Sequence, residues 1–229
     1  MKKIRHNLTK MVTALLFGFL VIGLTLPANA AEEQDIVEKA RITFESFMTD
    51  PNMAWLKENM PTAKGIVIVP SLLKAGFVFG GSGGSGVLIV PDAKTGKWSE
   101  PAFYTIGSVS FGLQIGGEAA EVVMYLRTQK AVDKMLTSSV KLGGDTSVSV
   151  GPVGAGVKSD VVTDIFSFSR SKGAFAGLAL DGSVVKTRDE WNKNYYGKAV
   201  TPVDILVKRS VNNPSSAGLR EAVSKAAKK

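Results

Sequence analysis

Residues 64–90 read KGIVIVPSLLKAGFVFGGSGGSGVLIV, and this stretch decides the fold. Two apolar, β-branched runs at 66–69 and 87–90 each stop at a proline, and a third run, 76–79, leads into a cluster of glycines. Short apolar runs bounded by glycine and proline are typical of buried strands. We therefore predict strands joined by a structural glycine loop. Its glycines are Gly80, Gly81, Gly83, Gly84 and Gly86.

The glycine loop has no side chain that can supply an acid, a base or a metal ligand. Glycine allows positive φ or close approach of the backbone to another surface, so we expect some of these glycines to be required for the fold. Residues 81–86 match the GxGxxG pattern of dinucleotide sites, but such a site needs a helix directly after the glycines. The apolar run at 87–90 predicts a strand there, which argues against nucleotide binding.

The remaining sequence indicates an α+β fold. Strand patterns occupy residues 66–126 and 146–185, whereas apolar residues at helical spacing occupy 36–48 and 128–138. Helix N-caps are predicted at Asp50, Thr187 and Thr201. Because strands occur in adjacent blocks, we predict antiparallel β-sheets folded as a sandwich or partial barrel, with an N-terminal helix and short peripheral helices. No repeat or long linker divides residues 31–229, which we interpret as a single domain.

The first 30 residues have the pattern of a secretory signal peptide. Basic residues precede an apolar segment at 11–26, and Ala28-Asn29-Ala30 supplies small residues for cleavage. The segment is short for a membrane span and has the wrong flanks, although an uncleaved anchor is the alternative. We predict cleavage after Ala30, export, and a periplasmic protein that is soluble or peripheral to a membrane.

The mature sequence has few of the residue types that carry out catalysis. The only histidine of the full sequence, His6, leaves with the signal peptide, and the sequence contains no cysteine. The usual hydrolase triad and zinc ligands are therefore missing. We predict no enzymatic activity, no cofactor and no metal site, and the SxxK sequences at 71–74 and 169–172 leave a lysine-activated serine as the catalytic alternative.

The charge of the mature sequence is mildly basic. Removing the four basic residues of the signal peptide from the 28 Lys and Arg leaves 24, against 20 Asp and Glu, a net charge of +4. That balance suits a weak preference for anionic surfaces.

Several sequence blocks resemble those of the SYLF domain, a lipid-binding family of bacterial envelope proteins and of eukaryotic membrane-trafficking and actin-patch proteins. The first block is the glycine-rich stretch quoted above. Seven more follow in the order of the family: KWSEPAF at 97–103, SFGLQIG at 110–116, KLG at 141–143, GPVG at 151–154, SFSRSKG at 167–173, LDG at 180–182 and YYG at 195–197. The resemblance covers residues 35–200, and the predicted helical tail at 201–229 lies outside it.

The resemblance implies a non-enzymatic protein that acts at a membrane surface. Its ligand would be an anionic phospholipid or a phosphoinositide-like headgroup, as in phosphatidylinositol binding. Arg170 and Lys172 lie two apart in a predicted strand and point to one face, where they would contact phosphates, with Lys74 nearby. Phe77 and Phe79 would add apolar contacts to the lipid. The alternatives are a solvated strand face for the cations and core packing for the two phenylalanines.

Two further alternatives concern surfaces. The N-terminal helix either packs on the core or contacts a membrane, and its acidic polar face favours packing because anionic lipid would repel it. The function could also be that of a structural or interaction protein that binds an envelope protein through a sheet edge. No nucleic-acid partner is expected.

Overall fold

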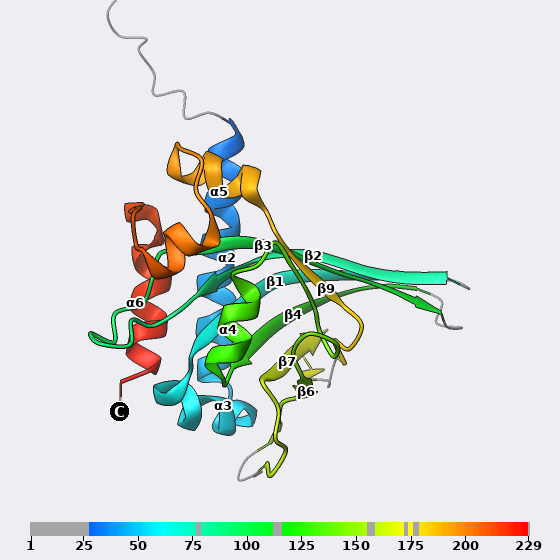
Figure 1. Ribbon diagram of the computed structural model, residues 1–229. Coiled ribbons are helices and arrows are strands. Elements are labelled where there is room, and N and C mark those ends of the chain that lie inside the picture. The colour runs from blue at the N-terminus through cyan, green and yellow to red at the C-terminus, as the bar shows by residue number, and fades with distance from the viewer. Residues whose placement is uncertain are drawn as a thin grey trace, which may run out of the picture.

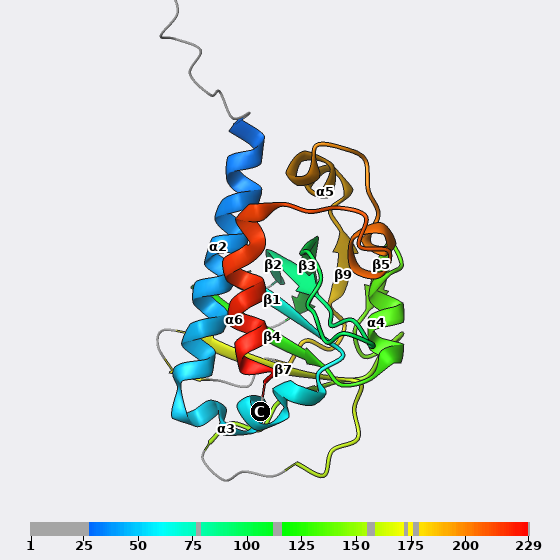
Figure 2. The same ribbon diagram turned by 90° about the vertical axis from the view of Figure 1, so that its left-hand side faces the viewer.

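The structure is a computed structural model that describes residues 28–76, 79–111, 116–154, 159–171, 174–175 and 179–228. Within these ranges, nine strands form one mixed, curled sheet with helices on both of its faces (Figure 1, Figure 2). The sheet closes about half of a barrel, so the predicted α+β fold and partial barrel are confirmed.

The central strands of the sheet come from the stretch that opened the sequence analysis. The strand order is β5 (Ser139–Lys141), β9 (Val184–Thr187), β3 (Ala102–Phe111), β2 (Phe79–Ile89), β1 (Gly65–Gly76), β4 (Gly116–Leu126), β7 (Ile165–Ser171) and β6 (Val148–Val150). A short strand, β8 (Ala174–Phe175), pairs with β7. Neighbouring strands are antiparallel except β6 and β7, which are parallel.

The sequence pattern predicted that the first strand would end at Pro70, but β1 continues beyond this residue. It continues to Gly76 through a β-bulge. Between Ile68 and Ser71 the pairing with β2 shifts, so that two residues of β1 lie opposite Gly86 alone. Proline has no N–H for the ladder, and a central strand accepts it at such a bulge.

The glycines predicted to form a loop lie inside β2, where all of them pair with β3 and all except Gly86, at the bulge, also pair with β1. Those whose geometry is described have no positive φ, but two of them allow a close backbone approach. A Cβ added to Gly84 would lie 2.5 Å from the carbonyl oxygen of Ser71, and one on Gly86 would lie closer still to that of Ile68. Gly83 faces open space. The bulge in β1 therefore explains two of these glycines.

The inner part of the sheet is buried on both faces. One face packs against α2 (Ala28–Thr49), α3 (Ala54–Asn59), α5 (Asp189–Tyr196) and α6 (Ala217–Ala226). The other face packs against α4 (Gln129–Met135) and a π-helical turn, η3 (Val203–Val207). Short 3₁₀ turns precede α3, follow it and precede α6: η1 (Pro51–Met53), η2 (Met60–Thr62) and η4 (Pro214–Ser216).

Helix α2 packs on the core, which is the alternative that its acidic polar face favoured over membrane contact. Val37, Ala40, Phe44 and Phe47 are fully buried against the sheet and α6. In the part of the chain that the structure describes, no helix combines the length and apolar composition needed to cross a membrane.

The outer parts of four strands extend beyond the helices as a thin projection (Figure 1). We call this projection the blade: residues 73–76, 79–85, 107–111 and 116–119. Two of its apolar side chains face solvent, since Leu73 is 61% and Val109 is 81% exposed.

Candidate functional site

The cations predicted to contact lipid do not form one cluster. Lys74 pairs in register with Glu118 of β4, whereas Arg170 pairs with Glu121 of the same strand. Successive side chains of a strand alternate between its faces, so Lys74 and Arg170 lie on opposite faces of the sheet. The other predicted residues lie outside the described ranges or have only a described backbone: Lys172, Phe77 and Phe79.

Arg170 lies under α2 and not on a solvated strand face, which was the alternative to phosphate binding. Its Nε donates to Glu121 Oε2 at 2.7 Å, and its Nη1 donates to Ser46 Oγ of α2, also at 2.7 Å. The guanidinium carbon lies 5.3 Å from the ring centre of Phe47, and the side chain is only 19% exposed. Arg170 therefore ties α2 to the sheet.

We expect Arg170→Gln to lower the free energy of unfolding by about 1–3 kcal/mol, because Glu121 loses its charged partner in a largely buried setting. Lys39→Gln removes an exposed ion pair with Asp35 and serves as the control, with an expected change below about 0.5 kcal/mol. Urea unfolding measures both values. Equal stability of Arg170→Gln and the wild type would contradict this structural role.

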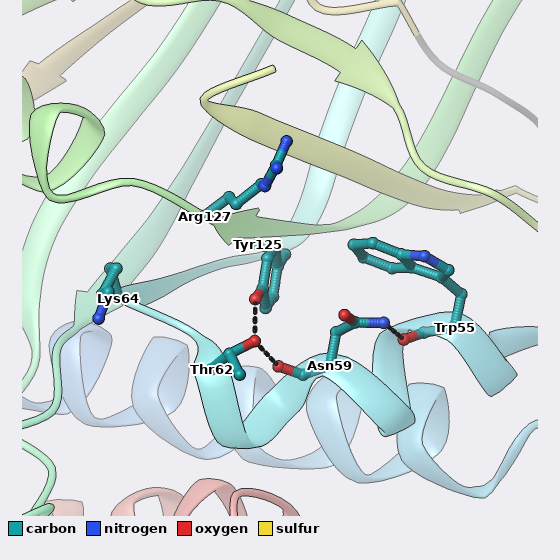
Figure 3. A pocket seen from close by; sticks show the side chains of 6 residues that line it. All are labelled: Trp55, Asn59, Thr62, Lys64, Tyr125 and Arg127. Atoms are coloured by element: carbon teal, nitrogen blue, oxygen red, sulfur yellow. Dashed lines mark hydrogen bonds between the residues drawn. The ribbon is translucent and has the colours of Figure 1, made fainter. Parts of the chain in front are cut away.

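A hollow at the α3 end of the molecule combines aromatic walls with two exposed cations (Figure 3). It encloses about 280 Å³ and is lined by Trp55, Asn59, Thr62, Lys64, Tyr125 and Arg127. Lys64 immediately precedes β1, and Arg127 immediately follows β4. These two strands pair at their ends, where the Lys64 amide donates to the Leu126 carbonyl at 2.9 Å. The register of the two strands therefore brings the two cations to the same hollow.

Hydrogen bonds and ring packing fix the floor of this hollow. The Thr62 hydroxyl donates to the Asn59 carbonyl at 2.9 Å, so the Tyr125 hydroxyl, 2.9 Å from Thr62 Oγ1, is the donor in their shared bond. The Trp55 ring packs edge-on against Tyr125 at 5.5 Å between ring centres. The floor of the hollow is therefore rigid and carries polar groups.

The charges around the hollow favour an anion. Burial raises the pKa of Tyr125, and its bond to Thr62 and the nearby charge of Arg127 only partly offset that effect, so the phenol is neutral at pH 7. Within the described residues, neither Lys64 nor Arg127 forms an ion pair. Two cations without a carboxylate partner at the mouth of a concave site attract phosphate or carboxylate groups.

A second, larger hollow lies on the other side of α3, between α2 and α6, which run side by side (Figure 2). It encloses about 560 Å³ and is lined by Phe44, Glu45, Met48, Thr49, Lys57, Ala222, Lys225 and Ala226. Lys57 and Lys225 flank its apolar floor. The α3 end of the molecule therefore carries basic residues around both hollows.

Sequence reasoning missed Lys64 and Arg127 because their separation along the chain hides their proximity. One feature of the sequence could have indicated them: Lys64 directly precedes the apolar strand segment 65–69, and Arg127 directly follows the segment 122–126. Only the register of β1 and β4 turns that signal into a site.

Comparisons with known proteins identify relatives of this chain. Residues 107–226 match the family model Ysc84, described as Las17-binding protein actin regulator. LAS seventeen-binding protein 3 of Saccharomyces cerevisiae is 40% identical over 151 residues, which are 63% of this chain and 32% of that protein. The SH3 domain-containing YSC84-like protein 1 of Homo sapiens is 36% identical over 151 residues, which are 63% of this chain and 43% of that protein. The chain spans less than half the length of these curated relatives.

Proposed function

Because this chain belongs to the Ysc84 (SYLF) family, we propose that it is a non-enzymatic protein that binds anionic phospholipid at a membrane surface. The observation that carries the proposal is the pair of exposed cations, Lys64 and Arg127, at the mouth of a concave site with an aromatic wall. Location in the bacterial envelope is part of the proposal. It rests on the signal-peptide pattern of residues 1–30, and the mass of the protein recovered from the periplasm tests it.

The proposed binding mode follows from the chemistry of the hollow. Arg127 offers a planar fork of donors to phosphate oxygens, and Lys64 offers a compact charge beside it. Trp55 suits the boundary between water and lipid, because its ring is apolar with one polar edge. Lys57 and Lys225, around the neighbouring hollow, add positive charge at the same end of the molecule.

We expect the double change Lys64→Gln, Arg127→Gln to weaken binding to anionic vesicles by roughly 10- to 30-fold, since each basic residue near such a surface contributes about 1 kcal/mol. Co-sedimentation with phosphatidylglycerol–phosphatidylcholine vesicles measures this. Wild-type binding should also weaken as salt rises, because exposed charges are screened over about 10 Å at 0.1 M. Vesicles of phosphatidylcholine alone should bind weakly.

The matched control is Lys193→Gln, Lys198→Gln, which removes the same charge in and just after α5. That helix lies at the opposite end of α2 from α3 (Figure 1). This control should bind nearly as well as the wild type, and circular dichroism checks that each variant is folded. Equal binding by a folded Lys64→Gln, Arg127→Gln variant would remove this site from the proposal, and a wild type that binds no vesicle would reject lipid binding itself.

A second candidate function is binding of a protein through the edge of the sheet. Strand β9 pairs with β3 only at residues 104–107, and among the described residues no strand covers 108–111 on that side. This segment has no charge and no proline, and it includes the exposed Val109, so an extended peptide can add to it. The yeast relative is named for binding a protein. Absence of binding by the wild type in the vesicle assay would favour this function.

A further inference from the structure

We propose that Val161 and Val162 insert into the headgroup–acyl boundary of an anionic bilayer, beside the hollow formed by Lys64 and Arg127. This inference rests on the proposed function and adds to it the part of the surface that enters the lipid. The residues concerned lie on the loop that leads into β7, outside the site predicted from the sequence.

The exposure of these two side chains is unusual. Val162 is 88% exposed and Val161 is 50% exposed. Single exposed apolar residues are normal on a soluble protein and need no explanation. Across the described ranges, however, Val161 and Val162 are the only large exposed hydrophobic residues that are adjacent in the chain. We call them the valine pair.

The loop that carries the valine pair is anchored at its base by Asp164. The Asp164 carboxylate accepts hydrogen bonds from Thr128 Oγ1 at 2.9 Å, from Lys130 Nζ at 3.0 Å, and from both the backbone N and Oγ of Ser147, at 3.1 and 2.9 Å. The preceding residue, Thr163, is buried. Two exposed valines therefore lie directly before two buried residues, Thr163 and Asp164, that hold the loop in place.

Arg127 joins the valine pair to the hollow. Its backbone N–H donates to the Asp164 carbonyl at 2.9 Å, and its Nη1 lies 3.4 Å from the Val161 carbonyl oxygen. The same side chain lines the hollow with Lys64 (Figure 3). Lys130, whose side chain is 61% exposed, forms an ion pair with Asp164 at 3.0 Å.

This arrangement of charge and apolar surface fits an anionic bilayer. Arg127 and Lys64 complement the headgroups, and the apolar pair beside Arg127 reaches the layer just below. A water-soluble anion would be satisfied by the cations alone and would leave the valine pair in water.

The chain contains no cysteine, so one fluorophore can be placed at one position. With the full mature chain, Val162→Cys carrying the environment-sensitive label NBD should show a blue shift and a several-fold rise in emission on addition of phosphatidylglycerol-containing vesicles. A quencher on the acyl chains should reduce that emission. Val109→Cys, at an equally exposed position on the blade, is the matched control and should show neither change.

A second variant separates apolar insertion from charge. Val161→Ser, Val162→Ser should weaken vesicle binding by about 10-fold with an unchanged dependence on salt, because it removes only methyl groups. Lys64→Gln, Arg127→Gln should weaken binding and also flatten the dependence on salt.

The outcomes distinguish this inference from the proposed function. Vesicle binding without a spectral change at position 162, and with the double-serine variant binding like the wild type, overturns the inference and leaves the proposed function standing. A spectral change at position 109 instead of 162 overturns it in favour of the blade. If the unlabelled wild type binds no vesicle, the proposed function and this inference fail together.

Discussion

Replacing Gly86 with alanine should lower the free energy of unfolding by about 3 kcal/mol, whereas the same change at Gly83 should leave it within about 0.5 kcal/mol of the wild type. A Cβ on Gly86 would lie 2.8 Å from Val69 Cγ2 and 3.0 Å from the carbonyl carbon of Ile68. The bulge that places these atoms there sits in β1, which is held on both sides by β2 and β4. The backbone therefore has little freedom to move away.

Gly83 is the matched control because it lies in the same strand and a Cβ there would meet nothing within 4 Å. Alanine at that position even restricts the unfolded chain, which opposes any loss of stability. Urea unfolding followed by circular dichroism measures both variants. Similar losses at Gly83 and Gly86 would mean that flexibility of β2, rather than close approach to the bulge, is what these glycines provide.

Asp164→Ala should cost about 3 kcal/mol, since one buried carboxylate accepts hydrogen bonds from Thr128, Lys130 and Ser147. Removing it leaves those donors without their acceptor at a site where the Asp164 side chain is only 12% exposed. Asp160→Ala, an exposed position in the same loop, is the control and should change the stability little.

The cost of Asp164→Ala should depend on pH in a defined direction. Burial by itself raises the pKa of Asp164, but the hydrogen bonds from Lys130, Ser147 and Thr128 outweigh it and hold the pKa well below its usual value. A carboxyl with a lowered pKa contributes its full stabilisation above the pKa of the unfolded chain, about 4, and loses it as the pH falls further. The difference between the wild type and Asp164→Ala should therefore be largest at neutral pH and shrink at pH 3. A difference that stays constant from pH 7 to pH 3 would contradict this account.

The fold was largely predictable because its signals are local. The apolar runs at 66–69 and 87–90 are central strands, and the N-caps at Asp50 and Thr201 form the hydrogen bonds that their sequences predicted. The prediction at Thr187 was wrong by one residue. Thr187 still belongs to β9, pairing with Tyr104, and the helix begins after Arg188. Pairing with a neighbouring strand outweighed the capping pattern.

The errors arose where a neighbouring strand decides the outcome. Pro70 looked like the end of a strand, because the bulge that accommodates it depends on two partner strands. Ser167 and Ser169 alternate with buried phenylalanines in β7, a pattern typical of a half-buried strand, yet both serines are buried as well. Similarly, the partner of Arg170 lies 49 residues away in the chain. Residue spacing within one strand carries none of this information.

Residues 108–111 of β3, which no strand covers among the residues that the structure describes, have a consequence for self-association. An uncovered strand without charge or proline is the geometry from which aggregates grow, since each new chain finds free N–H and C=O groups. In the blade, however, glycine and serine fill most positions of β2 and of the outer part of β3. Glycine in a strand weakens it by roughly 0.5–1 kcal/mol, and fibril-forming segments contain few glycines. The exposed edge of β3 therefore belongs to a glycine-rich projection, which opposes its use as a template for fibrils.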